Sequence, residues 1–589
     1  MSDSGDPLPE LDAISDRAND PPFPDVESTY VKYLGQWLQK DIDDLEAIAN
    51  ANYNSLLPRP IDPGVVFDLL KVRKSLDTAR ELAETAEDWI TRFSGTWMKG
   101  LSSSSAFDGD RATVDKNTSV RKLEIACRYL ARSLLRDDMA VNIAQLHSHS
   151  AVLDIAGAVL QSNSSDSDAK YVSFLHQNIK TEELADITIL QTLMGLTGRQ
   201  YGEPELFRTI ADIKAYQEDF DGAAEDFGRA LETSSYPQSR SSSSVDGSSQ
   251  GLTVHNDLPR EQDAVLAEND QPSGFKAQII FRRAHVYLSR ACGWVDGCFP
   301  SSESSTPRAH QPDHGGREEK PSQSLSEEQR NSKTQVKRWA EKALNEFMHF
   351  LSHFDYSPNV PKQMKPSLTG SKPLPTQTKG IPPHIVYSLE KLFSDPLPPN
   401  LPAFPPSVPV KKDGTEREHK GKSTIATCEL VTYHPHLTDA LHAVLLCHCL
   451  LQTAPPELLQ HAYMVARLVR LAHGFPLFIA PVAAAAFDWK QIIRQTETSE
   501  NSLHLSSVWD ELCHGRTTSD EDASNPISES VSHYLSATQS KDQLISDRVE
   551  PIVRWMLYGP STQDKTSVED TSALIAGLQN LTTGSSSGT

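Results

Sequence analysis

The feature that most constrains this fold is a stretch of regularly spaced small and apolar residues, LFRTIADIKAYQEDFDGAAEDFGRALE, at residues 206–232. Side chains that share one face of a helix recur every three or four positions, and two such patterns flank Glu218-Asp219. Small residues let two helices approach closely, and an aromatic ring fills the space between them. The stretch therefore predicts two packed helices joined by a tight turn. The positions that carry the pattern are Phe207, Ile210, Ala211, Lys214, Ala223, Phe227 and Ala230.

This arrangement resembles a tetratricopeptide repeat (TPR), whose first helix carries a small residue and whose second carries Ala, an aromatic and Ala. Tyr236-Pro237 stands where such a unit usually ends. At the end of the first helix, Lys214 occupies a position where the family has an aromatic. The resemblance covers about 30 residues. It implies an all-α fold, an irregular TPR-like array of helical hairpins with long disordered insertions.

Helical periodicity and low-complexity tracts predict the rest of the organisation. The tracts contain too little apolar surface to offset the entropy lost on ordering. The predicted segments are a disordered acidic arm (1–27), an N-terminal helical hairpin (28–100), a helical array ending in the TPR-like repeat (119–233), a disordered Ser-rich linker (234–272), a helix pair with a disordered insertion at 300–332 (273–355), a disordered Pro-rich then basic linker (356–425), a C-terminal helical region (428–581) and a disordered tail (582–589).

Three segments leave alternatives open. A helix of about 35 residues ending near Trp97 needs a partner along its length, either the first helix as a hairpin or a second copy in a coiled coil. Segments 275–291 and 336–354 are either the halves of one repeat opened by a loop or unrelated helices. The short amphipathic segment 384–393, inside the Pro-rich tract, either docks on the array or binds a partner.

Composition limits the classes of partner and compartment. The chain has 56 Lys+Arg against 79 Asp+Glu, and this acidic balance opposes a broad nucleic-acid surface, which needs clustered positive charge. Seven cysteines, sparse and odd in number, indicate free thiols in a reducing compartment. The first residues do not have the pattern of a signal peptide, and no apolar run reaches 18 residues. We therefore expect a cytoplasmic or nuclear protein that is not secreted and has no membrane span.

The search for chemistry finds no phosphate-binding loop, dinucleotide fingerprint, nucleophile elbow or HExxH motif. We therefore expect no enzymatic activity and no cofactor or metal. Cys447 and Cys449 lie two positions apart on a predicted helix and so point in different directions. The same spacing argues against His147 with His149. Two further pairs lack the neighbours or the spacing of a metal or redox site: His434 with His436, and Cys292 with Cys298.

Binding signals are stronger. The TPR resemblance implies a peptide-binding groove lined by the first helices of successive repeats; the alternative is a solvated charged face. In chaperone-binding members of the family, a Lys or Arg is followed one turn later by Asn; Arg208 fits, but Asp212 would repel a carboxylate. The candidate groove residues are Arg208, Asp212, Tyr216, Lys276, Arg282 and Arg283.

The Pro-rich tract adds a second candidate. Pro406, Pro409 and Lys411 fit the form that SH3 domains read from a polyproline helix; the alternative is a plain linker. Together these features predict an intracellular TPR-like scaffold or adaptor that binds peptide segments of partner proteins. The alternative function is a structural subunit of a larger complex, assembled through helices 28–98. The oligomeric state stays open.

Overall fold

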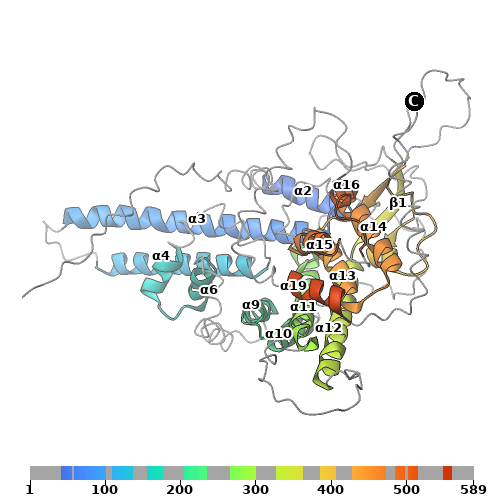
Figure 1. Ribbon diagram of the computed structural model, residues 1–589. Helices are drawn as coiled ribbons and strands as arrows, with labels where there is room; N and C mark the ends of the chain where they lie inside the picture. The colour runs from blue at the N-terminus through green and yellow to red at the C-terminus, as the bar shows by residue number, and fades with distance from the viewer. Residues whose placement is uncertain are drawn as a thin grey trace, which may run out of the picture.

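The protein is mostly helical, with one small sheet, in the computed structural model (Figure 1). A long pair of helices projects from a rounded body that contains most of the other elements. The residues that the structure describes are 41–55, 59–100, 109–136, 155–176, 204–234, 266–299, 327–361, 385–405, 427–472, 484–497, 502–514 and 548–559.

The projecting pair consists of α3 (Pro63–Gly100) and α4 (Gly109–Arg136), which pack along one another. With 38 residues α3 is about 57 Å long, which confirms the predicted long helix. Its partner along this length is α4, whereas α2 (Ile42–Tyr53) packs only on its first turns. The contact of α2 with α3 corresponds to the predicted hairpin, but the longer partner of α3 is α4, whose first turns are rich in polar residues. The seam is formed by Leu76, Ala79, Ala83, Leu123, Ala126, Cys127 and Leu130.

The stretch 206–232 forms the helix pair α9 (Pro204–Tyr216) and α10 (Phe220–Ser234). Glu218 ends the first helix with a φ of 62°, and the Asp219 Oδ1 accepts a hydrogen bond of 3.0 Å from the Gly222 N–H, which caps the second. The turn is therefore where the sequence predicts it. The residues buried between the helices include Ala211, Ala223, Phe227 and Ala230.

An ion pair replaces the family's aromatic at the end of α9. Lys214 Nζ lies 2.6 Å from Asp226 Oδ2, and the two side chains are only 16% and 4% exposed. Arg229 lies 3.2 Å from the other oxygen of Asp226. A buried carboxylate needs a partner of opposite charge, so Lys214 contributes a charge contact where the family has ring packing.

The body is built on α11 (Phe275–Gly293) and α12 (Glu327–Leu351), which pack against each other. The segments 275–291 and 336–354 are therefore paired, as one of the two alternatives predicts. Phe281 contacts the rings of Phe347 and Phe350 at centroid distances of 6.2 and 5.4 Å. Helix α6 (Ser167–His176) packs on α4 in the arm (Figure 1). The body also contains α13 (Leu437–Leu451), α14 (Pro455–Ala472), α15 (Ala484–Gln495), α16 (Trp509–His514) and α19 (Val549–Tyr558).

A three-stranded antiparallel sheet corrects the expectation of an all-α fold. Its order is β2 (Tyr387–Ser388), β1 (Asp355–Pro361) and β3 (Thr427–Val431), with an irregularity in β1 between Ser357 and Val360. The strands are too short, and β1 too rich in proline, to show period-2 alternation in the sequence.

The linker predicted to be disordered at 356–425 is also too long. Residues 385–405 have defined structure, including the 3-10 helix η5 (Leu389–Phe393). Leu389 and Leu392 are fully buried, and η5 contacts both α12 and α14. The amphipathic segment 384–393 thus docks on the helices, the first of its two predicted outcomes, because its two leucines supply apolar surface in an otherwise polar tract.

At the junction of α3 and α11, Gly64 and Gly274 let the two backbones approach closely. A Cβ on Gly64 would lie 2.5 Å from the Gly274 nitrogen, whose N–H donates a 2.7 Å hydrogen bond to Asp68 Oδ2. Gly64→Ala is therefore expected to lower the free energy of unfolding by about 1–3 kcal/mol, because backbone must move. A Cβ on Gly228 in α10 would meet nothing within 4 Å, so Gly228→Ala is expected to raise it by about 0.5–1 kcal/mol. Urea unfolding of both variants checks the opposite signs.

None of the helices in the described part of the chain combines the length and the apolar character that crossing a membrane requires.

Candidate functional site

Arg208, the first predicted groove residue, is buried at the contact between α9 and α11. Only 4% of it is exposed. Its Nη1 donates a 3.3 Å hydrogen bond to Gln278 Oε1, and its guanidinium lies 5.7 Å from the centre of the Phe275 ring. Arg208 therefore fixes one helix pair on the next and does not line an open groove. The predicted groove position of Arg208 is therefore wrong. The sequence alone does not distinguish an arginine buried between two helix pairs from one that faces solvent.

Two of the three predicted cations of α11 are paired within the protein. Arg282 Nη1 lies 3.0 Å from Asp212 Oδ1, and Arg283 Nη2 lies 2.6 Å from Glu346 Oε1. Tyr216 and Lys276 are exposed. The structure thus brings Asp212 and Arg282 together as a salt bridge between successive helix pairs, which occupies the charges that the peptide-groove hypothesis needed.

The remaining sequence candidates divide into described and undescribed residues. Pro406, Pro409 and Lys411 lie outside the described residues, as do His147 and His149. Cys447 and Cys449 are buried on α13, where burial raises the pKa of each thiol; that of Cys449 is about 12. Burial likewise raises the pKa of Cys292 to about 12 and that of Cys298 to about 11. Within the described ranges, no three His, Cys, Asp or Glu side chains are grouped as metal ligands.

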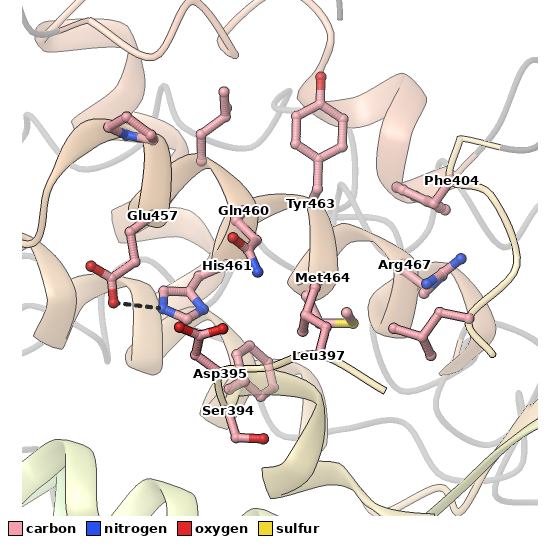
Figure 2. Close-up of a pocket in the computed structure, with 14 residues that line it drawn as sticks. Ser394, Asp395, Leu397, Phe404, Glu457, Gln460, His461, Tyr463, Met464 and Arg467 are labelled. Carbon is pink, nitrogen blue, oxygen red and sulfur yellow. Dashed lines mark ion pairs between the residues drawn. The ribbon is translucent and has the colours of Figure 1, made fainter. Parts of the chain in front are cut away.

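A groove beside α14 is a candidate site within the described residues (Figure 2). It has a volume of about 790 Å³ and lies between α14 and the irregular segment that follows η5. Helix α14 presents one face to it because its lining residues recur every three or four positions. From α14 these are Glu457, Gln460, His461, Met464 and Arg467; from the segment, Ser394, Asp395, Leu397, Leu401 and Phe404. We call this the α14 groove.

One end of the α14 groove carries negative charge. His461 Nε2 lies 3.8 Å from Glu457 Oε1, and Asp395 lies beside this pair (Figure 2). Burial lowers the pKa of His461, although Glu457 partly offsets it. His448 stacks on His461 at 4.3 Å, and burial together with His461 lowers its pKa to about 3. Both imidazoles are therefore neutral near pH 7, which leaves two carboxylates as the charges at this end.

Arg467 closes the other end. Its Nε lies 3.2 Å from Glu429 Oε1, and its Nη2 donates a hydrogen bond to the carbonyl oxygen of Pro402. The guanidinium lies 5.5 Å from the centre of the Phe404 ring, which also meets Tyr463 edge-on at 6.4 Å. This end of α14 thus holds the irregular segment 394–405 by one carbonyl and one aromatic side chain.

A buried His–Asp pair elsewhere has the composition of a catalytic dyad. His285 Nε2 lies 2.7 Å from Asp439 Oδ2, and its Nδ1 lies 3.1 Å from Arg548 Nη1. Burial lowers the pKa of His285, although Asp439 partly offsets it, so the ring is neutral and accepts a hydrogen bond from Arg548 at Nδ1, while Nε2 lies within ion-pair distance of Asp439. The pair therefore joins α11 to α13 and to the residue that precedes α19.

Arg548 extends this buried network to α15. Its Nη2 and Nε lie 2.9 and 3.1 Å from Asp488 Oδ2. Asp488 is fully buried and Arg548 is 4% exposed. A second contact fixes the same region, since Trp555 Nε1 donates a 2.8 Å hydrogen bond to the Leu450 carbonyl. Four helices thus meet around one buried set of charges, which sequence periodicity alone did not indicate.

Comparison with protein-family models, with curated proteins and with solved structures finds no match to this chain. The fold and the α14 groove therefore have to be interpreted from their own geometry.

Proposed function

We propose that this protein is a non-catalytic helical scaffold that binds extended peptide segments of partner proteins, and that the α14 groove is a binding site. One observation carries the proposal. Part of the groove wall is itself a proline-containing segment without regular secondary structure, held through the Pro402 carbonyl by Arg467 and through the Phe404 ring. The face of α14 thus already recognises a backbone of the kind a partner would supply.

The scaffold half of the proposal is supported by successive helix pairs. α9–α10 packs on α11–α12 through α10, and small residues lie at the contact. Salt bridges such as Asp212–Arg282 join one pair to the next. This is the arrangement expected of a degenerate TPR-like array, in which each pair buries the exposed face of its neighbour.

The groove also defines the chemistry of the peptide. Its centre, lined by Leu397, Leu401 and Met464, fits an apolar side chain. Glu457 and Asp395 favour a neighbouring Lys or Arg, since opposite charges across a recognition site add specificity. The preferred segment is therefore extended, carries one apolar anchor and has a basic residue beside it.

The test compares two fluorescein-labelled peptides with the same leucine- and proline-containing core, one flanked by lysines and one by glutamates. Fluorescence anisotropy with the full chain is expected to show at least tenfold tighter binding of the lysine-flanked peptide. Glu457→Lys is expected to remove this preference, and Met464→Asp is expected to abolish binding by placing a charge in the apolar centre.

The matched control is Arg470→Glu, one turn away on the same helix and outside the groove lining. It is expected to bind as the unmodified chain does, with unchanged circular dichroism for every variant. Equal affinity for both peptides, or equal loss in the Arg470→Glu control, would contradict the proposed site.

The α3–α4 pair favours the alternative function. It projects about 57 Å and places a long helical surface away from the body (Figure 1). Such an arm suits a structural subunit that assembles with a larger complex through residues 28–98. Charge reversal in the α14 groove would leave that assembly intact, so co-purification of the Met464→Asp variant with its partners distinguishes the two functions.

A further inference from the structure

The seam between α11 and α12 carries a cluster of cations and aromatic rings that the proposed function does not use. Trp339 lies between Lys342, whose Nζ is 4.3 Å from the ring centre, and Arg290, whose guanidinium carbon is 4.8 Å away. Arg338 lies 5.8 Å from the same ring, and Lys342 also lies 5.6 Å from the ring of Tyr287. We call Tyr287, Arg290, Arg338, Trp339 and Lys342 the Trp339 surface.

The antiparallel packing of α11 and α12 explains this geometry. Proceeding along the seam, Arg283 faces Glu346, Tyr287 faces Lys342, and Arg290 faces Trp339. The residues recur every three or four positions on each helix, so one outward face carries all of them. The two rings lie 5.6 Å apart and provide a partly exposed apolar base beneath the cations.

Carboxylates already bind the cations at both edges of the Trp339 surface. Arg290 Nη2 lies 2.6 Å from Asp221 Oδ2, and Arg283 Nη2 lies 2.6 Å from Glu346 Oε1. Between them, neither Arg338 nor Lys342 forms an ion pair with a carboxylate of the described residues. This surface is therefore a positive site, with carboxylate-compatible geometry, on a chain whose net charge is −23.

We propose that the Trp339 surface binds the chain's own acidic segment, residues 1–27. That segment carries eight carboxylates and one arginine, a net charge of 1 − 8 = −7, so its charge is complementary to the surface. Tethering to the same chain raises its effective concentration to the millimolar range, which favours it over an acidic segment of another molecule.

The tether is long enough for this contact. Asn50 of α2 accepts a 3.1 Å hydrogen bond from the backbone of Leu266, which precedes α11. The path from Asp41 to Tyr287 is at most about 62 Å: about 14 Å along α2 to Asn50, at most about 28 Å from Leu266 to Gly274, and about 20 Å along α11. The chain between Asp16, in the middle of the acidic segment, and Asp41 spans up to about 80 Å when extended, which exceeds this path.

The segment 1–27 would therefore compete with acidic peptides of other proteins for the Trp339 surface. An acidic peptide of a partner would reach the Trp339 surface only after it displaced the segment 1–27. This contact is separate from the α14 groove, so its failure would leave the proposed peptide binding in that groove untouched.

The test uses a fluorescein-labelled synthetic peptide of residues 1–27 and two full-length chains. The first chain is unmodified; in the second, the acidic residues of that segment are replaced by Asn or Gln. They are Asp3, Asp6, Glu10, Asp12, Asp16, Asp20, Asp25 and Glu27. Anisotropy is expected to show binding to the neutralised chain and at least tenfold weaker binding to the unmodified one, whose own segment occupies the surface.

Variants in the neutralised chain locate the site. Lys342→Glu is expected to weaken binding of the peptide at least tenfold, whereas the matched charge reversal Lys333→Glu, on the same helix but near Cys298, leaves it unchanged. Binding should also weaken when salt rises from 50 to 300 mM, since exposed charges are screened. Equal affinity for the two full-length chains, no binding to the neutralised chain, or an unaltered affinity in Lys342→Glu would overturn the proposal.

Discussion

Replacing Arg548 with alanine is expected to lower the free energy of unfolding by about 3–5 kcal/mol, the largest effect of any single change considered for this protein. The reason is that Asp488, fully buried, would lose its guanidinium partner, and His285 would lose the donor to its Nδ1. A buried carboxylate without a counter-charge is far more costly than a missing contact. Urea unfolding followed by tryptophan fluorescence measures the loss.

Two controls separate lost charge pairing from lost packing. The double variant Arg548→Met with Asp488→Asn removes both charges and is expected to recover most of the stability. Arg554→Ala breaks a 2.7 Å ion pair with Asp296 whose side chains are 37% and 73% exposed, and should cost less than about 1 kcal/mol. If Arg548→Ala proves no more harmful than Arg554→Ala, the buried network does not stabilise the fold.

Acidification is expected to have the second largest effect. Burial lowers the pKa of His442 to about 4, from an ordinary value of 6.5, so the folded state keeps this imidazole neutral. As pH falls, the unfolded chain protonates His442 at a higher pH than the folded state does. The contribution of neutral His442 to the free energy of unfolding is therefore complete above pH 6.5 and is lost as pH falls toward 4. The shift corresponds to about 3 kcal/mol for His442 alone. His448, with a pKa of about 3, acts in the same direction at lower pH.

The pH dependence of the free energy of unfolding, measured from pH 7.5 to pH 4, tests this. His442→Asn retains a donor for the Thr438 carbonyl, which now lies 2.7 Å from His442 Nδ1, but cannot titrate in this range. Between pH 6.5 and 4 the unfolding free energy of this variant should fall less steeply with pH than that of the unmodified chain. The difference in slope corresponds to at most one proton bound on unfolding. Parallel curves for the variant and the unmodified chain would show that His442 does not carry the effect.

Local periodicity was sufficient to predict the helices, because a helix that buries one face must repeat its apolar residues. The turn at Glu218-Asp219 and the long α3 follow from such patterns, whereas the pairing of α11 with α12 was one of two alternatives that the patterns left open. The sheet did not follow, since β2 has only two residues and β1 is interrupted by prolines. Its strands are defined by pairing between segments far apart in the chain.

The predicted groove shows a different limit. Sequence position places Arg208 and Arg282 on helix faces, but only the packing of α9 against α11 shows that one is buried and the other meets Asp212. Charges that look available for a partner are then used to join successive helix pairs. Contacts between successive helix pairs therefore account for the charge of these residues.

One wall of the α14 groove, the face of α14, could be predicted from the sequence, and the opposite wall could not. The spacing of Glu457, His461, Met464 and Arg467 is a helical face that the sequence displays. The opposite wall comes from residues 394–404, within a tract predicted to be disordered. The burial of Leu389 and Leu392, together with the contacts of Arg467 to Pro402 and Phe404, fixes that wall in place.

The position of α19 has a consequence for synthesis on the ribosome. Asp488 and its partner Arg548 are separated by 60 positions, which take about 3–12 s to translate. During that interval the helices already made, α11, α13 and α15, cannot close around Asp488 without stranding its charge. The body of the protein is therefore expected to complete its folding late, when α19 emerges, while the α3–α4 arm and the α9–α10 pair are free to form earlier.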